Sequence, residues 1–421
     1  MKFKHYYIAE LLSEISMGPF GSNIKKECFV DSGIPVLNGS NLTDVAMNDD
    51  AFRYVTKEKA DSLGRANAQR GDVVVTHRGT LGQISFIPKD SMYDRYVISQ
   101  SQFRFRCNEK VIPEYLVYYF HTRKGQHDLL SNASQVGVPA LARATTTFQQ
   151  LEIDLPEIEE QRKIVEILED IRRKIELNKE INNNLEQQAQ LLFKSWFVDF
   201  EPFNGTMPSD WEVVPFEKIV DFQNGYAFKS KELLNEPSSD CYQVFKQGHI
   251  ARGGGFIPDG TKSWYPKKLA SKLERFVLKK GDILMAMTDM KDNVAILGNT
   301  AIMPIDNEYI VNQRVGHLRV NGYKGITYPF IYLLTNSTDF LIDLRSRANS
   351  GVQVNLSSAE IKASQTVLPS EKVNTAFSEI TLPMFEAIIS NQLENQRLAQ
   401  LRDALLPKLM SGELDVSNID L

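Results

Sequence analysis

The sequence predicts an α+β fold in which two mixed α/β domains are separated by two long antiparallel helices, with an internal pseudo-two-fold repeat. Three observations predict this fold. The first half of the chain recurs about 210 residues later. Each copy begins with short apolar runs bounded by turn residues, and each copy ends in a long stretch of helical periodicity. A chain of 421 residues also exceeds one ordinary core.

The repeat is carried by short motifs that occur twice in the same order. Residues 71–75 (GDVVV) recur as 281–285 (GDILM), and residues 96–100 (YVISQ) recur as 309–313 (YIVNQ). Residues 131–134, which precede Gly137-Val138, recur as 347–350, which precede Gly351-Val352. The Leu-Pro pair at 155–156 recurs at 368–369. These motifs place the first domain at 1–156, the first helix at 157–200, the second domain at 201–369, the second helix at 370–414 and a tail at 415–421.

Both domains contain the patterns of short strands and of a few helices. The apolar runs 73–75, 84–87 and 283–285 are short and bounded by Gly, Asp and Pro, which is typical of strands. Residues 113–121 and 328–334 have a helical pattern. We therefore expect several short strands in each domain.

The first long helix contains a 4-3 heptad alternation without Gly or Pro. Its apolar seam consists of Ile164, Leu168, Ile171, Ile175, Leu185, Ala189, Leu192 and Trp196, and the two remaining seam positions are Asn178 and Asn182. A shift of about 213 residues gives the second seam: Phe377, Thr381, Met384, Ile388, Asn391, Asn395, Leu398 and Leu405. A 40-residue helix would be roughly 60 Å long.

The asparagines fall at the same two seam positions in both helices. A seam asparagine weakens a helix pair but fixes its register, so matched asparagines suit antiparallel packing along the helices. In the alternative interpretation these side chains are exposed, and the apolar stripe drifts to Ile181 and Ile389. Pro383 should kink the second helix or mark a late start.

Charge and cysteine content restrict the class of protein. The net charge of −5 and a pI of about 5.8 count against autonomous, tight nucleic-acid binding, although by our count the acidic excess lies on the two helices. Three separated cysteines fit a reducing cytosol and no disulfide framework. No apolar run suggests a membrane span, and residues 1–7 lack the pattern of a signal peptide, so we expect a cytoplasmic protein.

Several segments identify a family. Residues 71–82 (GDVVVTHRGTLG), 155–156 with 160–165 (EQRKIV), 225–231 (GYAFKSK) and 405–414 (LLPKLMSGEL) resemble motifs of the specificity subunits of type I restriction-modification enzymes. The resemblance covers nearly the whole chain. The second copy departs from the pattern in two places. It has Thr288-Asp289-Met290 where the first copy has Arg78-Gly79-Thr80, and its helix opens with SEKV at 370–373 and not with the EQRK of the first helix. The two domains should therefore read different sequences.

The resemblance implies that two target recognition domains each read half of a split DNA target with an unspecified gap. The two helices would act as a spacer and bind two methyltransferase subunits, which carry S-adenosylmethionine and methylate adenine. Restriction subunits would cleave double-stranded DNA with ATP and Mg. No cofactor, metal or catalytic residue is expected on this chain. Two readers held by a fixed spacer also agree with the repeat itself, because symmetric DNA readers place their units roughly 34 Å apart.

Polar and basic residues on turns are the candidate DNA contacts, because Arg and Lys suit guanine and phosphates while Asn and Gln suit adenine. They are Ser22, Lys25, Arg78, Thr80 and Gln100 in the first domain, and Lys229, Lys231, Lys246, Arg252, Lys291, Gln313 and Arg314 in the second. For each one an exposed structural role is an equal alternative. Gln100 and Gln313 are equivalent, which also suits a role in the fold.

Signs of catalysis are sparse. The chain has neither a phosphate-binding loop nor an Asn-Pro-Pro-aromatic methyltransferase motif. Asp259 with Glu360 is interpreted as a chance match to a nuclease, and the triplet 253–255 as a flexible turn. The aromatic residues Trp196, Phe197, Phe200 and Phe203 form either a core or a docking surface for the methyltransferase. Two other readings remain: a coiled-coil scaffold that binds protein, and an unrecognised metal-dependent enzyme.

Overall fold

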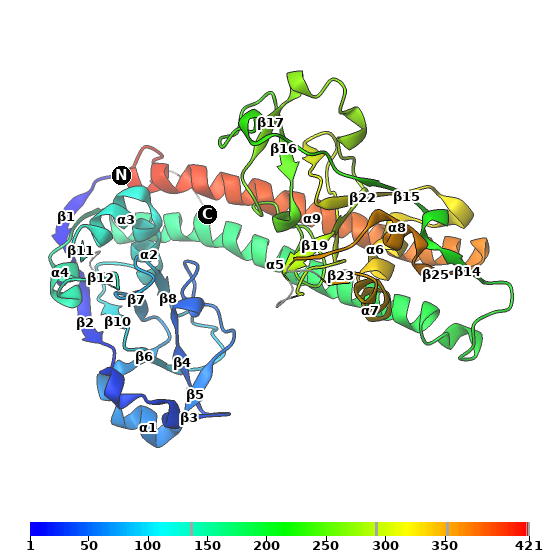
Figure 1. The fold of residues 1–421 in the computed structure, drawn as a ribbon. Coiled ribbons are helices and arrows are strands. Elements are labelled where there is room, and N and C mark those ends of the chain that lie inside the picture. The colour runs from blue at the N-terminus through cyan, green and yellow to red at the C-terminus, as the bar shows by residue number, and fades with distance from the viewer. Residues whose placement is uncertain (135–137, 291–293, 351–352, 418, 420–421) are drawn as a thin grey trace. The chain divides into compact units, whose positions relative to one another are not determined.

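The computed structural model describes residues 1–134, 138–290, 294–350, 353–417 and 419 (Figure 1). The chain divides into two compact units. The first contains Met1–Ile175 with Arg397–Leu421, and the second contains Glu176–Gln396. The division runs through both long helices, so it differs from the domain boundaries expected from the sequence. Each unit holds one mixed domain and a part of both helices.

The first unit is built from thirteen strands and four short helices in the described residues. The strands are β1 (Lys4–Tyr7), β2 (Leu12–Met17), β3 (Phe29–Val30), β4 (Ile34–Leu37), β5 (Arg53–Val55), β6 (Asn67–Gln69), β7 (Val73–Thr76), β8 (Ile84–Phe86), β9 (Arg95–Ile98), β10 (Gln102–Cys107), β11 (Ala133–Ser134), β12 (Ala140–Leu141) and β13 (Glu152–Leu155). The helices are α1 (Lys57–Ser62), α2 (Pro113–His121), α3 (Arg123–Leu130) and α4 (Ala144–Gln149).

The second unit repeats this order. Its strands are β14 (Glu212–Pro215), β15 (Val220–Asn224), β16 (Cys241–Phe245), β17 (Trp264–Pro266), β18 (Ile283–Ala286), β19 (Thr288–Met290), β20 (Thr300–Ile302), β21 (Tyr309–Val311), β22 (Val315–Val320), β23 (Asn349–Ser350), β24 (Gln353–Asn355) and β25 (Gln365–Leu368). Its short helices are α6 (Tyr328–Thr335), α7 (Thr338–Ser346) and α8 (Ser358–Ala363). The long helices are α5 (Ile158–Phe197) and α9 (Glu371–Ser411).

The sheet topology shows the internal repeat directly. The first unit contains a four-stranded antiparallel sheet in the order β2-β10-β7-β8, and the second contains β15-β22-β18-β20 in the same arrangement. A parallel pairing accompanies each sheet, between β4 and β9 and between β16 and β21. The runs predicted as strands form β7, β8 and β18, and the predicted short helices form α2 and α6.

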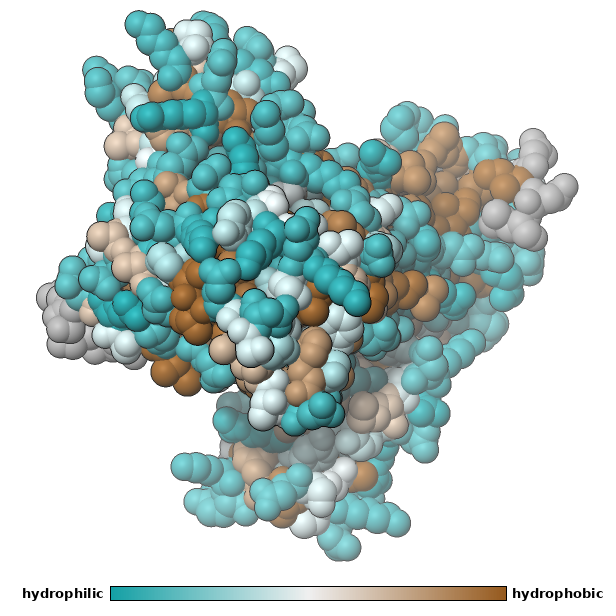
Figure 2. Space-filling view, turned by 90° about the vertical axis from the view of Figure 1, so that its right-hand side faces the viewer, coloured by the Kyte–Doolittle hydropathy of each residue, from teal (hydrophilic) through white to brown (hydrophobic). Residues whose placement is uncertain are grey.

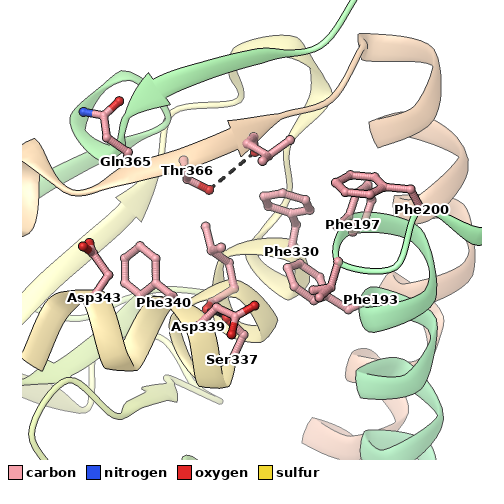
Figure 3. A pocket seen from close by; sticks show the side chains of 13 residues that line it. Phe193, Phe197, Phe200, Phe330, Ser337, Asp339, Phe340, Asp343, Gln365 and Thr366 are labelled. Atoms are coloured by element: carbon pink, nitrogen blue, oxygen red, sulfur yellow. Dashed lines mark hydrogen bonds between the residues drawn. The ribbon is translucent and has the colours of Figure 1, made fainter. Parts of the chain in front are cut away.

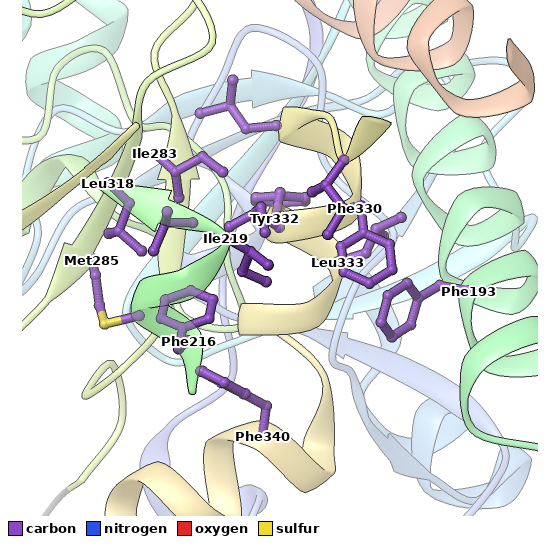
Figure 4. Close-up of a cluster of buried hydrophobic side chains, with 14 of the residues drawn as sticks. Phe193, Phe216, Ile219, Ile283, Met285, Leu318, Phe330, Tyr332, Leu333 and Phe340 are labelled. Atoms are coloured by element: carbon purple, nitrogen blue, oxygen red, sulfur yellow. The ribbon is translucent and has the colours of Figure 1, made fainter. Parts of the chain in front are cut away.

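The apolar side of each four-stranded sheet packs against a short helix and the long helices. In the second unit, Phe216, Ile219, Ile283 and Leu318 surround α6, and Phe193 of α5 closes the cluster (Figure 4). In the first unit, Ile164 and Leu168 of α5 and Leu409 of α9 join the corresponding core. The long helices are therefore part of both domain cores.

A buried aspartate explains the repeated Gly-Asp motif. Asp72 accepts hydrogen bonds from the backbone N–H of Gln69 over 2.9 Å and from Nε of Arg106 over 2.7 Å. Asp282 likewise accepts hydrogen bonds from the backbone N–H of Lys279 over 2.8 Å and from Nε of Arg319 over 2.8 Å. The preceding glycines have φ of +85° and +84°, a conformation that disfavours side chains. The motif thus joins a tight turn to the neighbouring strand.

The seam asparagines face each other within the second unit. Nδ2 of Asn178 donates to Oδ1 of Asn395 over 2.9 Å, and Nδ2 of Asn391 donates to Oδ1 of Asn182 over 2.9 Å. Residue numbers rise along α5 as they fall along α9, so the helices are antiparallel. Asn178 is fully buried and Ile181 is 45% exposed, so the alternative interpretation is wrong for the first helix. In the second helix Ile389 is buried as that interpretation expected, while Asn391 and Asn395 are half-buried and not exposed.

The other predicted seam residues also pack inward. Ile164, Leu168, Ile171, Ile175, Ala189, Phe377, Thr381 and Ile388 are buried, whereas Leu185, Leu192, Trp196, Met384, Leu398 and Leu405 are half-buried. Helix α9 runs through Pro383, so the expectation of a late start is wrong. The first part of the predicted tail packs on the first unit, where Val416 is buried and Lys163 donates to the carbonyl of Ser417 over 3.0 Å.

Candidate nucleic-acid interface

Four turns meet at one edge of the first domain. Strands β2 and β7 are both antiparallel to β10, so they run in the same direction and end at the edge where β10 begins. Strand β4 is parallel to β9, and β9 leads through a short turn into β10. We call the resulting surface, residues 18–25, 38–41, 77–80 and 99–101, the first turn edge.

Hydrogen bonds join the turns of this edge. The N–H of His77 donates to the carbonyl of Ser101 over 2.9 Å, and the N–H of Gly18 donates to the carbonyl of Gln102 over 2.8 Å. Nε2 of Gln83 donates to the carbonyl of Gly39 over 2.9 Å. The turns therefore form one surface.

The second domain contains the equivalent surface. Strands β15 and β18 are antiparallel to β22, and β16 is parallel to β21. Residues 225–231, 246–255, 287–290 and 312–314 form what we call the second turn edge. Gln247 joins two of its turns, because its amide donates to the carbonyl of Thr288 over 2.6 Å and accepts from the Thr288 hydroxyl over 2.8 Å.

The first turn edge brings together the candidates of the first domain. Lys25, Arg78, Thr80 and Gln100 are exposed on it. Ser22 lies in the turn 21–23, but its side chain is outside the described part of the structure. Burial lowers the pKa of His77, which precedes Arg78 and whose Nε2 lies 3.3 Å from the carbonyl oxygen of Gln100.

The second turn edge brings together most candidates of the second domain. Lys229, Lys231, Arg252, Gln313 and Arg314 are exposed, and Lys246 is half-buried. Arg252 belongs to this edge because it precedes the glycine turn 253–255. The N–H of Gly255 in that turn donates to the carbonyl of Thr300 over 3.0 Å, and Thr300 pairs with Met285 near the end of β18. Lys291 lies outside the described residues. Contact of any of these side chains with DNA stays a prediction.

The comparisons with known proteins assign both copies of this arrangement to one family. The model of the type I restriction modification DNA specificity domain matches residues 17–187 and 208–402, and each match contains one turn edge. The chain belongs to the type I restriction-modification specificity family. Its expected α+β class with an internal repeat is thereby confirmed.

Named relatives span most of the chain. The MjaIX specificity subunit of Methanocaldococcus jannaschii is 26% identical over 87% of this chain and 83% of its own. The HindI specificity subunit of Haemophilus influenzae is 25% identical over 95% of this chain and 99% of its own. The S subunit structure from M. genitalium covers 97% of this chain and 96% of that one, with 16% identity and a TM-score of 0.59, which supports the fold. Specificity subunits are the non-catalytic part of these enzymes.

Sequence reasoning missed the turn at residues 38–41 of the first edge in this specificity subunit, although Lys246 and Arg252 were predicted on the equivalent turn of the second edge. The turn after β4 is closed by Asn41, whose Oδ1 accepts from the N–H of Asn38 over 2.9 Å. The turn after β16 is closed in the same way by His249, whose Nδ1 accepts from the N–H of Lys246 over 3.1 Å. Burial lowers the pKa of His249. Because the closing residues differ, the sequence repeat does not show this equivalence.

The aromatic residues at the end of α5 pack largely as a core of the second unit. The ring centroids of Phe197 and Trp211 lie 5.7 Å apart, and those of Phe203 and Trp211 lie 5.0 Å apart. Trp196 lies against Phe377 at 5.8 Å. Together with Phe193, Phe330 and Phe340, Phe197 and Phe200 also line a cavity of about 320 Å³ (Figure 3).

The face of the molecule drawn in Figure 2 is mainly hydrophilic, with separate hydrophobic patches. Among the described residues, no group of three or more His, Cys, Asp or Glu side chains is arranged to hold a metal ion. No helix in the same part of the chain is long and apolar enough to span a bilayer.

Proposed function

We propose that this specificity subunit reads a split DNA target, with each turn edge reading one half. The observation that carries the proposal is that the same four-turn edge is built twice from different side chains. Arg78, Gly79 and Thr80 on the first edge are replaced by Thr288, Asp289 and Met290 on the second. Since bases are distinguished by the side chains presented to their edges, different turns on one scaffold support two different half-sites.

The character of the two edges agrees with this role. Both edges carry the positive charge that phosphates attract, although the whole chain is acidic. The charge comes from exposed Lys25 and Arg78 on the first edge and from exposed Lys229, Lys231 and Arg314 on the second. Exposed Gln100 and Gln313 provide amides of the kind that pair with adenine. The edges thus combine groups for positioning and for base reading.

The long helices would set the gap between the half-sites. Helices α5 and α9 contain 40 and 41 residues, which corresponds to roughly 60 Å each. We expect a fixed number of unread base pairs as a result.

Partner subunits would perform the chemistry. Leu177, Ile181 and Leu191 of α5 are between 45% and 67% exposed and fall on one stripe of the helix, which supports docking of another protein there. We propose two methyltransferase subunits that use S-adenosylmethionine to methylate adenine, and restriction subunits that use ATP and Mg to cleave DNA. We further propose a cytoplasmic location and no cofactor on this chain.

The test is to co-express the chain with the methyltransferase subunit encoded beside it and to map methylated adenines on genomic DNA. The expected result is a split motif with a constant gap. Replacing residues 1–156 by the corresponding domain of a relative should change one half of the motif, and replacing 201–369 should change the other. A motif that survives both replacements, or the absence of any complex, would overturn the proposal and favour the scaffold reading. Turnover of DNA by the chain alone would favour the enzyme reading.

A further inference from the structure

Phe20, on the first turn edge, is 84% exposed, and no large apolar side chain in the described part of the chain is more exposed. It follows β2 and precedes the turn 21–23. An aromatic ring left in water forfeits the favourable transfer free energy that burial would recover. A contact that the ring makes only when DNA is bound would recover this transfer free energy.

The backbone on both sides of Phe20 is held in place. The N–H of Asn23 donates to the carbonyl of Phe20 over 2.8 Å, and the N–H of Gly18 donates to that of Gln102 over 2.8 Å. A Cβ on Gly18 would lie 2.0 Å from the carbonyl oxygen of Ser99, so the turn is pressed against the β9–β10 turn. The ring therefore projects from a backbone that neighbouring strands position.

Phe20 shares the first turn edge with polar and cationic residues. Lys25, Arg78 and Gln100 on this edge are exposed, and so is Lys26, which follows it in the sequence. A protein-docking surface usually offers a contiguous apolar patch, whereas an exposed aromatic ring on a surface that also carries cations is typical of proteins that stack on bases or wedge between them.

We propose that Phe20 inserts its ring between two base pairs of the half-site read by the first turn edge, while Lys25 and Lys26 contact the flanking phosphates. This inference rests on the proposed function of that edge. The equivalent glycine of the second domain is Gly225, whose added Cβ would likewise collide with a carbonyl, that of Asn312, at 2.1 Å. The residue two positions later is Ala227, and the ring of the following Phe228 packs against Tyr265 with the centroids 4.8 Å apart, so the insertion is confined to the first half-site.

Insertion would also serve the chemistry of the complex. An enzyme that modifies a base within a duplex must first take the base out of the stack, and the unstacking costs free energy. A ring already placed between two base pairs would lower that cost at the half-site where it is bound. The contribution of Phe20 to DNA binding should therefore depend on how readily the contacted base-pair step unstacks, and not on the identity of one base.

The experiment uses the assembled complex of this chain with its methyltransferase subunit and duplexes that carry the mapped motif. F20A should bind the intact duplex roughly 5- to 150-fold more weakly than the unchanged chain. A duplex with a mismatch at the contacted step should restore most of the binding, since the unstacking is already done. F20W should bind like the unchanged chain. M92A is the matched control, because Met92 is 66% exposed before β9 begins, away from the edge at which β9 ends.

Two results would overturn the insertion. One is equal binding of the F20A and unchanged complexes to the intact duplex. The other is a loss that the mismatch does not restore, because Phe20 would then contact a base edge or support the turn. Failure of the unchanged complex to prefer the split motif would instead contradict the proposed function, so the two failures are distinguishable.

Discussion

Nδ2 of Asn178 lies 2.9 Å from Oδ1 of Asn395, and a second hydrogen bond of 2.9 Å joins Asn391 to Asn182. In the sequence repeat Asn178 corresponds to Asn391, and Asn182 corresponds to Asn395. Each bond therefore joins the first asparagine of one helix to the second asparagine of the other helix. A two-fold relationship between antiparallel helices requires this pairing. Mispairing by one turn would break both bonds, so the asparagines fix the register of the helix pair.

Removal of the buried asparagine should cost more than removal of the half-buried one. Asn178 donates to Glu394 over 2.7 Å as well as to Asn395, and it is fully buried. We predict that Asn178→Ala lowers the free energy of unfolding by about 1–3 kcal/mol, and that Asn182→Ala lowers it by less because water reaches that site. Urea unfolding of both variants measures the difference, and a larger loss for Asn182→Ala would contradict the prediction.

A tyrosine hydroxyl anchors the first domain to α5. The hydroxyl of Tyr118 donates to Oε1 of Glu169 over 2.8 Å, and both side chains are buried. We predict that Tyr118→Phe lowers the free energy of unfolding by about 1–3 kcal/mol, because Glu169 loses a buried partner. Tyr115→Phe is the control on the same helix, since the buried Tyr115 hydroxyl has no hydrogen-bond partner among the described residues, and it should be neutral or stabilising. Equal losses in thermal unfolding would refute the role of the bond.

The seam of the long helices could be predicted because it is a local pattern. Asn178 and Asn182 interrupt an otherwise apolar heptad stripe, and the same interruption recurs at Asn391 and Asn395. Pro383 misled the sequence argument about where α9 begins. The helix continues past it, and the apolar residues before it, among them Phe377, are held by the domain core.

The turn edges could be predicted only in part. Arg78 and Gln100 belong to motifs that repeat, so their equivalents were found. The turn closed by Asn41 or His249 reaches the edge through the parallel pairings of β4 with β9 and of β16 with β21. Such a pairing joins segments about 60 residues apart, and no local spacing indicates it. Exposure of Phe20 likewise follows from tertiary packing and not from its neighbours in sequence.

The buried carboxylate of Asp282 should make the second unit sensitive to acid. Burial opposes its charge, but hydrogen bonds from His317 over 2.8 Å and from Arg319 hold the pKa of Asp282 below its ordinary value. A lowered pKa stabilises the fold above the unfolded-state pKa of about 3.9, and this contribution is lost as the pH falls through the folded-state pKa. We predict that Asp282→Asn lowers the free energy of unfolding by about 3–5 kcal/mol at pH 7.

The loss caused by Asp282→Asn should shrink below roughly pH 4, where the unchanged protein also loses the contribution. Urea unfolding from pH 7 to pH 3 measures both. Asp210→Asn is the control, since Asp210 is exposed in the same unit and lies outside the ion pairs of Asp282 with His317 and Arg319, and its effect should stay within about 0.5 kcal/mol. A difference between Asp282→Asn and the unchanged protein that is constant over this range would show that the carboxylate charge is not responsible.

Two glycines should control the two half-sites separately. A Cβ on Gly225 would lie 2.1 Å from the carbonyl oxygen of Asn312, and one on Gly18 would lie 2.0 Å from that of Ser99. Because these atoms belong to the backbone of the turns that carry Gln313 and Gln100, the turns must shift. We predict that Gly225→Ala weakens recognition of one half-site about tenfold or more, and that Gly18→Ala does the same to the other half-site only. At Gly64 nothing lies within 4 Å of an added Cβ, and the φ of +50° adds only a local backbone strain of about 1–2 kcal/mol, so the control Gly64→Ala should leave the recognition of both half-sites unchanged. Methylation mapping with each variant provides the measurement, and loss of the same half-site in both variants would contradict the assignment of one turn edge to each half.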